Sequence, residues 1–221
     1  MIRWEHLDTA PIPDGGELKL MRRGTEYSIM SGSIELMNSR LSGSEEALAT
    51  LTCEGLKAGA EVLIGGLGMG FTLRAALGLL PAGARVTVAE LVPAVVAWAR
   101  GPLAAVFAGS LDDPRVRIRE GDVAEAIEDA RGIFDAILLD VDNGPGGLNR
   151  EANDGLYDPP GLARARRALK PGGILAVWSA APDERFTGRL RKAGFAVEEK
   201  RVRATRSGRG ARHVIWLART A

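Results

Sequence analysis

From residue 61 onward, short apolar runs alternate with longer stretches of helical character. The apolar runs predict strands over Glu61–Gly65, Arg85–Leu91, Arg115–Arg119, Ile133–Asp140 and Ile174–Ser179. The longer stretches predict helices over Phe71–Leu80, Pro93–Phe107, Val123–Ala130, Pro160–Leu169 and Glu184–Lys192. This alternation is typical of a parallel sheet with right-handed crossovers and helices on both faces. We therefore expect a doubly wound, mostly parallel α/β sheet, closed by an antiparallel hairpin over Phe195–Arg203 and His213–Arg219.

The first part of the chain has a different pattern. Short strand-like stretches separated by Gly, Ser or Thr predict a small antiparallel β-meander over Glu17–Arg22, Glu26–Met30 and Ser33–Met37. Ser44 then precedes two glutamates and an apolar run to Leu56, which predicts the start of a helix. We therefore divide the chain into an N-terminal β-meander appendage, residues 1–43, and a Rossmann-like transferase domain, residues 44–221.

Composition restricts the partners that the protein can have. The 221 residues include 29 basic and 28 acidic ones, so the net charge of +1 favours neither a nucleic acid nor a membrane as a partner. No apolar run is long enough to span a bilayer, and the N-terminus lacks a signal-peptide pattern. Cys53 is the only cysteine, and His6 and His213 have no ligand motif beside them, so we expect no metal site. A cytoplasmic enzyme acting on a small molecule is the expectation.

A glycine-rich loop joins the first core strand to its helix. The loop contains Gly65, Gly66, Leu67, Gly68 and Gly70, so its pattern is G-G-x-G-x-G. Glycines let the backbone approach a ligand closely, and a helix N-terminus offers free N–H groups to an anion. The spacing differs from the dinucleotide pattern G-x-G-x-x-G and suits an amino-acid carboxylate better than a pyrophosphate. The alternative is a tight structural turn.

Acidic residues follow the next two strands. Glu90, with Leu91 after it, ends the second core strand, where a carboxylate can accept hydrogen bonds from a ribose diol. Asp122, with Val123 after it, follows the third strand and could accept from an adenine amino group. The alternatives are a solvated strand end for Glu90 and a helix N-cap for Asp122. With the glycine loop, these residues predict S-adenosylmethionine as the bound cofactor.

The fourth core strand ends at the expected reaction centre. Asp140 should lie above the sulfonium, where it could orient an acceptor amine and take its proton. Asp142 and Asn143 could hold a second amine or hydroxyl of the substrate. The alternatives are a capped strand end for Asp140 and a turn for the other two, because Asp-Asn-Gly-Pro is strong turn chemistry.

Several segments occur in the same order as in one known family. They are Val62–Gly70, Val88–Leu91, Asp113–Val116 with Gly121-Asp122, Phe134–Asp140, Gly144-Pro145, Leu156-Tyr157 and Ala168–Leu175. Together they resemble spermidine synthases, the polyamine aminopropyltransferases built on the class I methyltransferase fold. The resemblance implies that fold, decarboxylated S-adenosylmethionine as the donor, and a substrate-binding role for Tyr157. The meander resembles the family's β-appendage and is a candidate surface for a homodimer.

Three departures from the family change the expected chemistry. Gly68 stands where the family has an aspartate in the glycine loop, the acceptor motif keeps only Asp140 clearly, and Ser44-Glu45-Glu46 replaces Tyr-His-Glu. Without the loop aspartate, we expect intact S-adenosylmethionine to bind more tightly than the decarboxylated form, with its carboxylate on the loop N–H groups. Our first interpretation is therefore a small-molecule methyltransferase. The alternative is an aminopropyltransferase, and the third interpretation is a non-catalytic nucleoside-binding protein.

Overall fold

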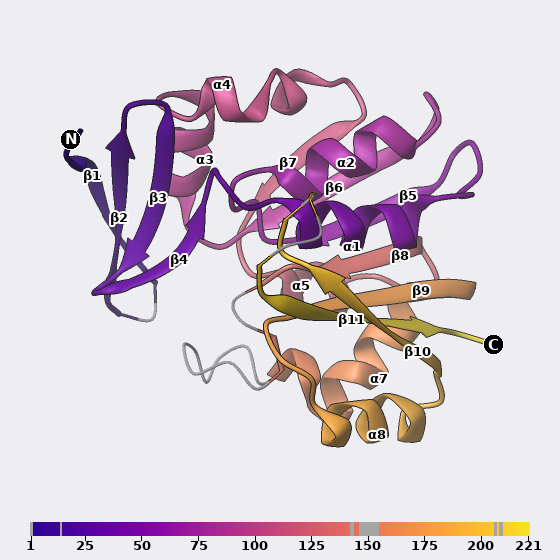
Figure 1. Cartoon of the computed structure of the whole chain (residues 1–221). Coiled ribbons are helices and arrows are strands. Elements are labelled where there is room, and N and C mark those ends of the chain that lie inside the picture. The colour runs from indigo at the N-terminus through magenta and orange to yellow at the C-terminus, as the bar shows by residue number, and fades with distance from the viewer. Residues whose placement is uncertain (1, 14, 142–143, 146–154, 206, 208–209) are drawn as a thin grey trace.

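The chain forms two sheets that lie side by side (Figure 1). The computed structural model describes residues 2–13, 15–141, 144–145, 155–205, 207 and 210–221. The smaller sheet is antiparallel, with its strands in the order β1 (Glu5–Pro11), β2 (Glu17–Arg23), β3 (Glu26–Ser31) and β4 (Ile34–Asn38). The meander expected from the sequence is therefore present and has one more strand than expected.

The larger sheet has seven strands in the order β10-β11-β9-β8-β5-β6-β7. Their bounds are β5 (Glu61–Gly65), β6 (Arg85–Glu90), β7 (Val116–Glu120), β8 (Phe134–Leu139), β9 (Leu169–Ser179), β10 (Ala196–Arg203) and β11 (Arg212–Arg219). Strands β5 to β9 are parallel, while β11 pairs antiparallel with β9 and β10. The strand order reverses between β5 and β8, and ligands of open α/β sheets bind at such a switch point.

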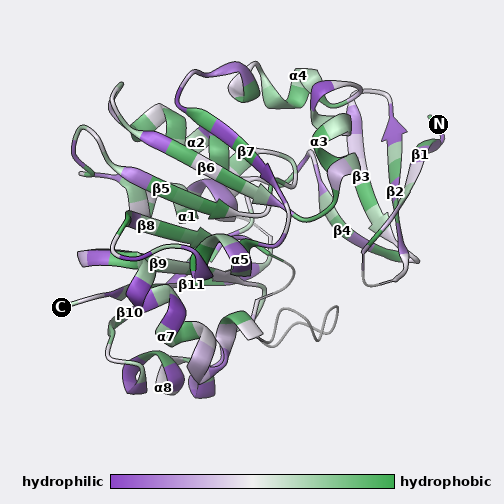
Figure 2. Ribbon diagram, turned by 180° about the vertical axis from the view of Figure 1, so that it is seen from behind, coloured by the Kyte–Doolittle hydropathy of each residue, from purple (hydrophilic) through white to green (hydrophobic). Residues whose placement is uncertain are grey.

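Helices cover both faces of the larger sheet, as the alternation predicts. Along β5, Val62 and Ile64 pack in one core and Leu63 packs in the other, which follows from the period of two in a strand. The first face carries α1 (Gly43–Cys53), α2 (Phe71–Leu79) and α3 (Pro93–Arg100); the second carries α5 (Val123–Glu128), α7 (Pro159–Ala168) and α8 (Glu184–Lys192). Hydrophobic residues dominate the central strands between these layers (Figure 2). The fold is the doubly wound α/β sheet that the sequence predicts.

Two elements differ from the expected ones. The expected helix over Pro93–Phe107 is broken into α3 and α4 (Ala104–Phe107), because Gly101 and Pro102 interrupt it. The sequence predicts a strand that begins at Ile174, whereas β9 already begins at Leu169. Neither difference changes the order of the strands. Within the described residues, no helix combines the length and hydrophobicity needed to cross a membrane.

The motif Asp113-Pro114-Arg115-Val116 has a structural role. Arg115 forms an ion pair with Asp113 at 2.7 Å and donates to the carbonyl oxygens of Leu77 and Leu80 at the end of α2, at 3.1 and 2.7 Å. These carbonyls have no partner within the helix. The motif thus fixes α2 against the start of β7, and it explains part of the family resemblance without invoking a ligand.

Candidate functional site

Two adjoining cavities lie at the switch point of the larger sheet. The larger cavity lies between the small sheet, the glycine loop and the ends of three core strands. It is lined by Ile12, Leu18, Ser31, Leu36, Met37, Gly66, Gly68, Ala89, Glu90, Leu91, Val92, Val95, Gly121, Asp122, Val123, Asp140 and Val141. The second, which we call the acidic cavity, is lined by Leu36, Met37, Asn38, Glu45, Leu67, Gly68, Met69, Gly70, Phe71, Asp140 and Trp178. Four residues line both cavities: Leu36, Met37, Gly68 and Asp140.

The glycine loop is closely packed against the protein. Gly66 has a φ of +89°, and a Cβ there would lie 2.5 Å from the carbonyl oxygen of Asp140. Gly70 has a φ of +75°, and a Cβ there would lie 2.4 Å from the ring of Phe107. Gly65 is buried, with Val123 and Leu139 close to it. Packing therefore requires glycine at two of the predicted positions, independently of any ligand.

Glu90 lines the larger cavity but is held by the protein's own backbone. Its carboxylate accepts from the N–H groups of Leu67 at 2.9 Å and Val92 at 2.8 Å, and also from those of Gly68 and Leu91. Burial raises the pKa of Glu90, and these four bonds oppose that shift. The predicted ribose contact remains a prediction, and the structure adds a second role, which is to fix the glycine loop.

The loop N–H groups that we expected to receive a carboxylate already have partners. Gly66 donates to Ala89 O at 2.9 Å, Gly70 donates to Leu67 O at 2.8 Å, and the N–H groups of Leu67 and Gly68 bind Glu90. This arrangement weakens the reason for expecting an intact amino-acid tail on the loop.

Asp122 is the N-cap of α5. Its side chain accepts from the N–H of Ala124 at 2.8 Å, and the residue also lines the larger cavity beside Val123 and across from Leu91 on the neighbouring strand end. One carboxylate oxygen suffices for this cap. The N-cap interpretation is therefore correct, while the contact with an adenine remains a prediction.

Asp140 is the carboxylate shared by both cavities. The hydroxyl of Thr72, in the first turn of α2, donates to its Oδ2 at 2.6 Å, and its backbone N–H donates to Gly65 O at 3.0 Å. The side chain is half-buried where the two cavities meet, and Glu45 is close enough to repel its negative charge. Burial, first, and this repulsion, second, raise the pKa of Asp140 to about 7. A carboxylate with such a pKa can exchange a proton near neutral pH.

Glu45 is a site residue that the sequence did not single out. It lies in the first turn of α1 and lines the acidic cavity with Asp140. Burial raises the pKa of Glu45, and a hydrogen bond from Ser44 at 2.7 Å opposes this. The only sequence signal was its position in place of the family's Tyr-His-Glu. The sequence alone could not show that Glu45 and Asp140 line the same cavity, because only the fold brings them together.

Other predicted residues lie elsewhere. Tyr157 is 3% exposed in the core, where its ring packs edge-on against Phe186 at 5.6 Å, and it is not among the described residues that line either cavity. The prediction of a substrate contact for Tyr157 therefore receives no support from this position. Asp142 and Asn143 lie outside the described residues. In the described parts of the chain, no group of three or more His, Cys, Asp or Glu side chains could hold a metal ion.

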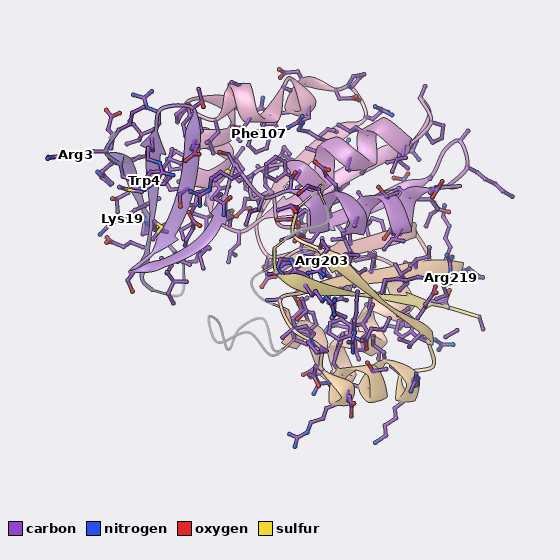
Figure 3. The ribbon with its side chains drawn as sticks, in the orientation of Figure 1. Arg3, Trp4, Lys19, Phe107, Arg203 and Arg219 are labelled. Atoms are coloured by element: carbon purple, nitrogen blue, oxygen red, sulfur yellow. The ribbon has the colours of Figure 1, made fainter. Side chains whose placement is uncertain are left out.

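The described basic residues of the terminal hairpin do not form one patch. Arg203 and Arg219 lie at opposite ends of the hairpin (Figure 3). Lys200 pairs with Glu198, and Arg201 lies 3.8 Å from Glu199. These pairs lower the net charge of the strand surface, so the described part of the hairpin does not favour an acidic ligand.

Comparison with known proteins supports the family resemblance. No protein-family model matches the chain. The polyamine aminopropyltransferase of Mycobacterium tuberculosis is 35% identical over 147 residues, which cover 62% of this chain and 27% of that protein. The chain thus spans well under half the length of this curated relative.

Solved structures agree on the fold. A spermidine synthase from Thermotoga maritima matches with a TM-score of 0.75 and 19% identity, covering 98% of this chain and 72% of the other. A precorrin-6y C5,15-methyltransferase from Geobacter metallireducens matches with a TM-score of 0.57 and 18% identity, covering 79% and 87%. The chain is therefore similar to polyamine aminopropyltransferases in sequence, and it shares the fold of spermidine synthases and methyltransferases.

Proposed function

We propose that the protein is an aminopropyltransferase that uses decarboxylated S-adenosylmethionine and an amine acceptor. The acidic cavity carries the proposal. Glu45 and Asp140 both line it, and its other described lining residues are apolar or uncharged. Two carboxylates in a partly buried cavity without a cationic side chain favour a cationic ligand. The names of the relatives that match in sequence support the same chemistry.

Glu45 supplies the acidic group that the glycine loop lacks. The absence of a carboxylate at Gly68 led us to expect an intact donor, yet Glu45 brings one into the same cavity from α1. An intact donor would add a third carboxylate beside two others, which is unfavourable. The decarboxylated donor ends in an ammonium instead. The structure therefore favours the alternative interpretation over the methyltransferase interpretation.

The larger cavity fits the nucleoside part of such a donor. Apolar side chains from both sheets form its walls, and the polar side chains of Glu90 and Asp122 stand at the ends of adjacent strands. Apolar walls with a few convergent polar groups are the usual environment of a bound nucleoside.

The protein's part in the reaction is to position the amine and remove its proton. The donor supplies an electrophilic carbon on its sulfonium, whose bonding electrons stay on sulfur when the C–N bond forms. An amine is a nucleophile only after its ammonium form has lost a proton. Asp140, with its raised pKa of about 7, is suited to take that proton while Glu45 holds positive charge nearby. The apolar residues around both carboxylates, Leu36 and Met37 among them, limit the access of water.

Methyl transfer from intact S-adenosylmethionine is the second candidate. Gly68 favours it, because the loop itself carries no carboxylate to repel that of the donor. The match in fold to a methyltransferase is compatible with it.

The by-products of the reaction distinguish the two functions. We would incubate the protein with 1,4-diaminobutane and either donor, and identify the sulfur product by mass spectrometry. Aminopropyl transfer leaves 5′-methylthioadenosine, whereas methyl transfer leaves S-adenosylhomocysteine. We expect the first product from the decarboxylated donor. Formation of S-adenosylhomocysteine alone would support the second candidate, and no turnover by Asp140→Asn alongside an active unmodified protein would support the role of Asp140.

A further inference from the structure

A chain of hydrogen bonds leads from the acidic cavity to the terminal hairpin. Ser44 lies 2.7 Å, Oγ to Oε2, from Glu45, and the Nδ1 atom of His213 lies 2.8 Å from the same Ser44 Oγ. Glu45 is at the cavity end, whereas His213 is on β11 and partly exposed. Ser44 and Glu45 are adjacent in the first part of the sequence, whereas His213 lies near its C-terminal end. Each distance is that of a good hydrogen bond.

The arrangement is held in place from several sides. Ser44 is fully buried, yet its hydroxyl does not cap α1; the N-cap residue is Ser42. The N–H of Gly43 donates to Ala204 O at 2.9 Å, which ties the start of α1 to the hairpin. The ring of Trp178, which also lines the acidic cavity, packs edge-on against the ring of His213 at 4.8 Å. Ser44 and His213 thus have fixed relative positions.

The proposed chemistry needs such a connection. Each turnover removes one proton from the acceptor's ammonium group, and the bound donor and acceptor would cover the half-buried carboxylates that can take it. A proton left on either carboxylate would weaken binding of the next cation. We propose, resting on the proposed function, that Ser44 and His213 carry this proton from Glu45 to solvent. Ser44 and His213 are then positioning and proton-transfer residues for Glu45 and do not contact the reacting atoms.

The path balances in five proton transfers and one reset. The ammonium gives its proton to Asp140 and becomes a neutral amine, and Asp140 passes the proton to Glu45 through the cavity that both residues line. The protonated Glu45 gives a proton to Ser44 Oγ, and the hydroxyl's own proton moves to His213 Nδ1. The imidazolium then releases its Nε2 proton to solvent. His213 regains its Nε2–H tautomer by exchange with water while the Ser44 hydroxyl turns back to Glu45, so no other reactant is required.

The surroundings of His213 suit a proton acceptor. Burial lowers the pKa of His213, which favours the neutral ring. In its Nε2–H tautomer, Nδ1 can accept from Ser44 once Glu45 is protonated and the hydroxyl no longer donates to it. Its contacts or partners are Ser44 from α1, Trp178 from β9 and Val202 from β10, none of which carries a charge. Glu45 is the carboxylate at the other end of its hydrogen-bond chain.

The first test needs neither donor nor turnover. The chain has two histidines, so ¹H–¹⁵N spectra of the full-length protein give two imidazole titrations, with His6 as an internal control. Removing a carboxylate connected to an imidazole should lower the pKa of that imidazole. We expect Glu45→Gln to lower the pKa of His213 by on the order of half a unit or more and to leave His6 unchanged. An unchanged His213 in folded Glu45→Gln would overturn the proposal, whatever the enzyme's activity.

The second test asks whether the hydroxyl and the imidazole conduct protons. Ser44→Thr retains a hydroxyl and Ser44→Ala does not, so turnover with 1,4-diaminobutane should fall about tenfold or more only in Ser44→Ala. His213→Ala should lose a similar factor and regain activity when free imidazole is added, which a purely structural loss would not do. Equal turnover in both Ser44 variants, or no effect of imidazole, would overturn the proposal. Failure of the unmodified protein to turn over would instead count against the proposed function, and the titration of His213 would still decide the proton path.

Discussion

Two carboxylates share one cavity at the proposed reaction centre, and their energetics follow from that proximity. Asp140 is half-buried and repelled by Glu45, and one hydroxyl, that of Thr72, stabilises its charged form. A bound cation would neutralise both carboxylates and lower their pKa values. The empty protein therefore carries an unfavourable charge that a cationic ligand would relieve.

The raised pKa of Asp140 predicts a pH-dependent stability. Because the folded state binds the proton more tightly, stability is lost as pH rises from the ordinary pKa of 3.8 through about 7. Asp140→Asn removes this penalty, so the variant should be more stable than the unmodified protein at pH 8, by at most roughly 4 kcal/mol before screening by water in the cavity. At pH 4 the two should be nearly equal.

Urea unfolding at both pH values measures this difference. Asp158→Asn is a matched control, because Asp158 caps α7 through the N–H of Gly161 and asparagine caps helices equally well. A loss of stability at pH 8 in Asp140→Asn, with the control unchanged, would show that Asp140 is not destabilising when charged.

The site residues that the sequence predicted are those that follow the ends of strands. Asp140 and Asp122 each follow a core strand, and the carboxyl ends of parallel strands lie at one edge of the sheet. Glu45 gave no comparable signal, since acidic residues are common in the first turn of any helix. Its partner Asp140 and the relay residue His213 are far away in sequence. Only the packing of α1 against β8 and β11 brings them together.

At the level of elements, β6 and the glycine loop form one unit through Glu90. Four backbone N–H groups on two segments converge on its carboxylate. A residue that only contacts a ligand could be removed with little effect on folding. The structure indicates the opposite, because removal would leave buried N–H groups without acceptors.

We therefore predict that Glu90→Ala is destabilised by about 2–5 kcal/mol, because several buried donors lose their partner at roughly 1–3 kcal/mol each and some regain water. Glu90→Gln keeps one oxygen acceptor and should lose less. Chemical denaturation of both variants tests the order. Stability of Glu90→Ala equal to that of the unmodified protein would leave Glu90 with a ligand-binding role alone.

Hydrophobic patterning predicted the core elements well, because each strand and helix carries its own periodicity. The strand β1 was missed because its residues are mostly exposed and alternate weakly. The break between α3 and α4 was missed because Gly101-Pro102 lies within an otherwise continuous apolar stretch.

In the whole molecule, the small sheet completes the site. Ile12, Leu18, Leu36 and Met37 line the larger cavity opposite the strand ends. The indole N–H of Trp98, on α3, donates to Asp8 on β1 at 2.6 Å and so joins the small sheet to the rest of the molecule. This bond lowers the pKa of Asp8, because it stabilises the charged carboxylate.

We predict that Asp8→Ala loosens the small sheet and weakens donor binding. Loss of the bond to Trp98 should speed amide hydrogen exchange in β1–β4 without affecting the seven-stranded sheet. Asp8→Asn keeps an oxygen acceptor and should exchange like the unmodified protein. Exchange mass spectrometry distinguishes the variants, and equal protection of β1–β4 in Asp8→Ala would mean that other contacts hold the sheet.

The central claim is that Glu45 and Asp140 make this site selective for a cationic donor tail. The most direct measurement is calorimetric titration of the protein with intact and with decarboxylated S-adenosylmethionine in one buffer. We predict that the decarboxylated form binds more tightly by about 1.4 kcal/mol or more, which is tenfold in affinity, and that Glu45→Gln narrows the difference. Tighter binding of intact S-adenosylmethionine to the unmodified protein would contradict the claim and return the methyltransferase interpretation to first place.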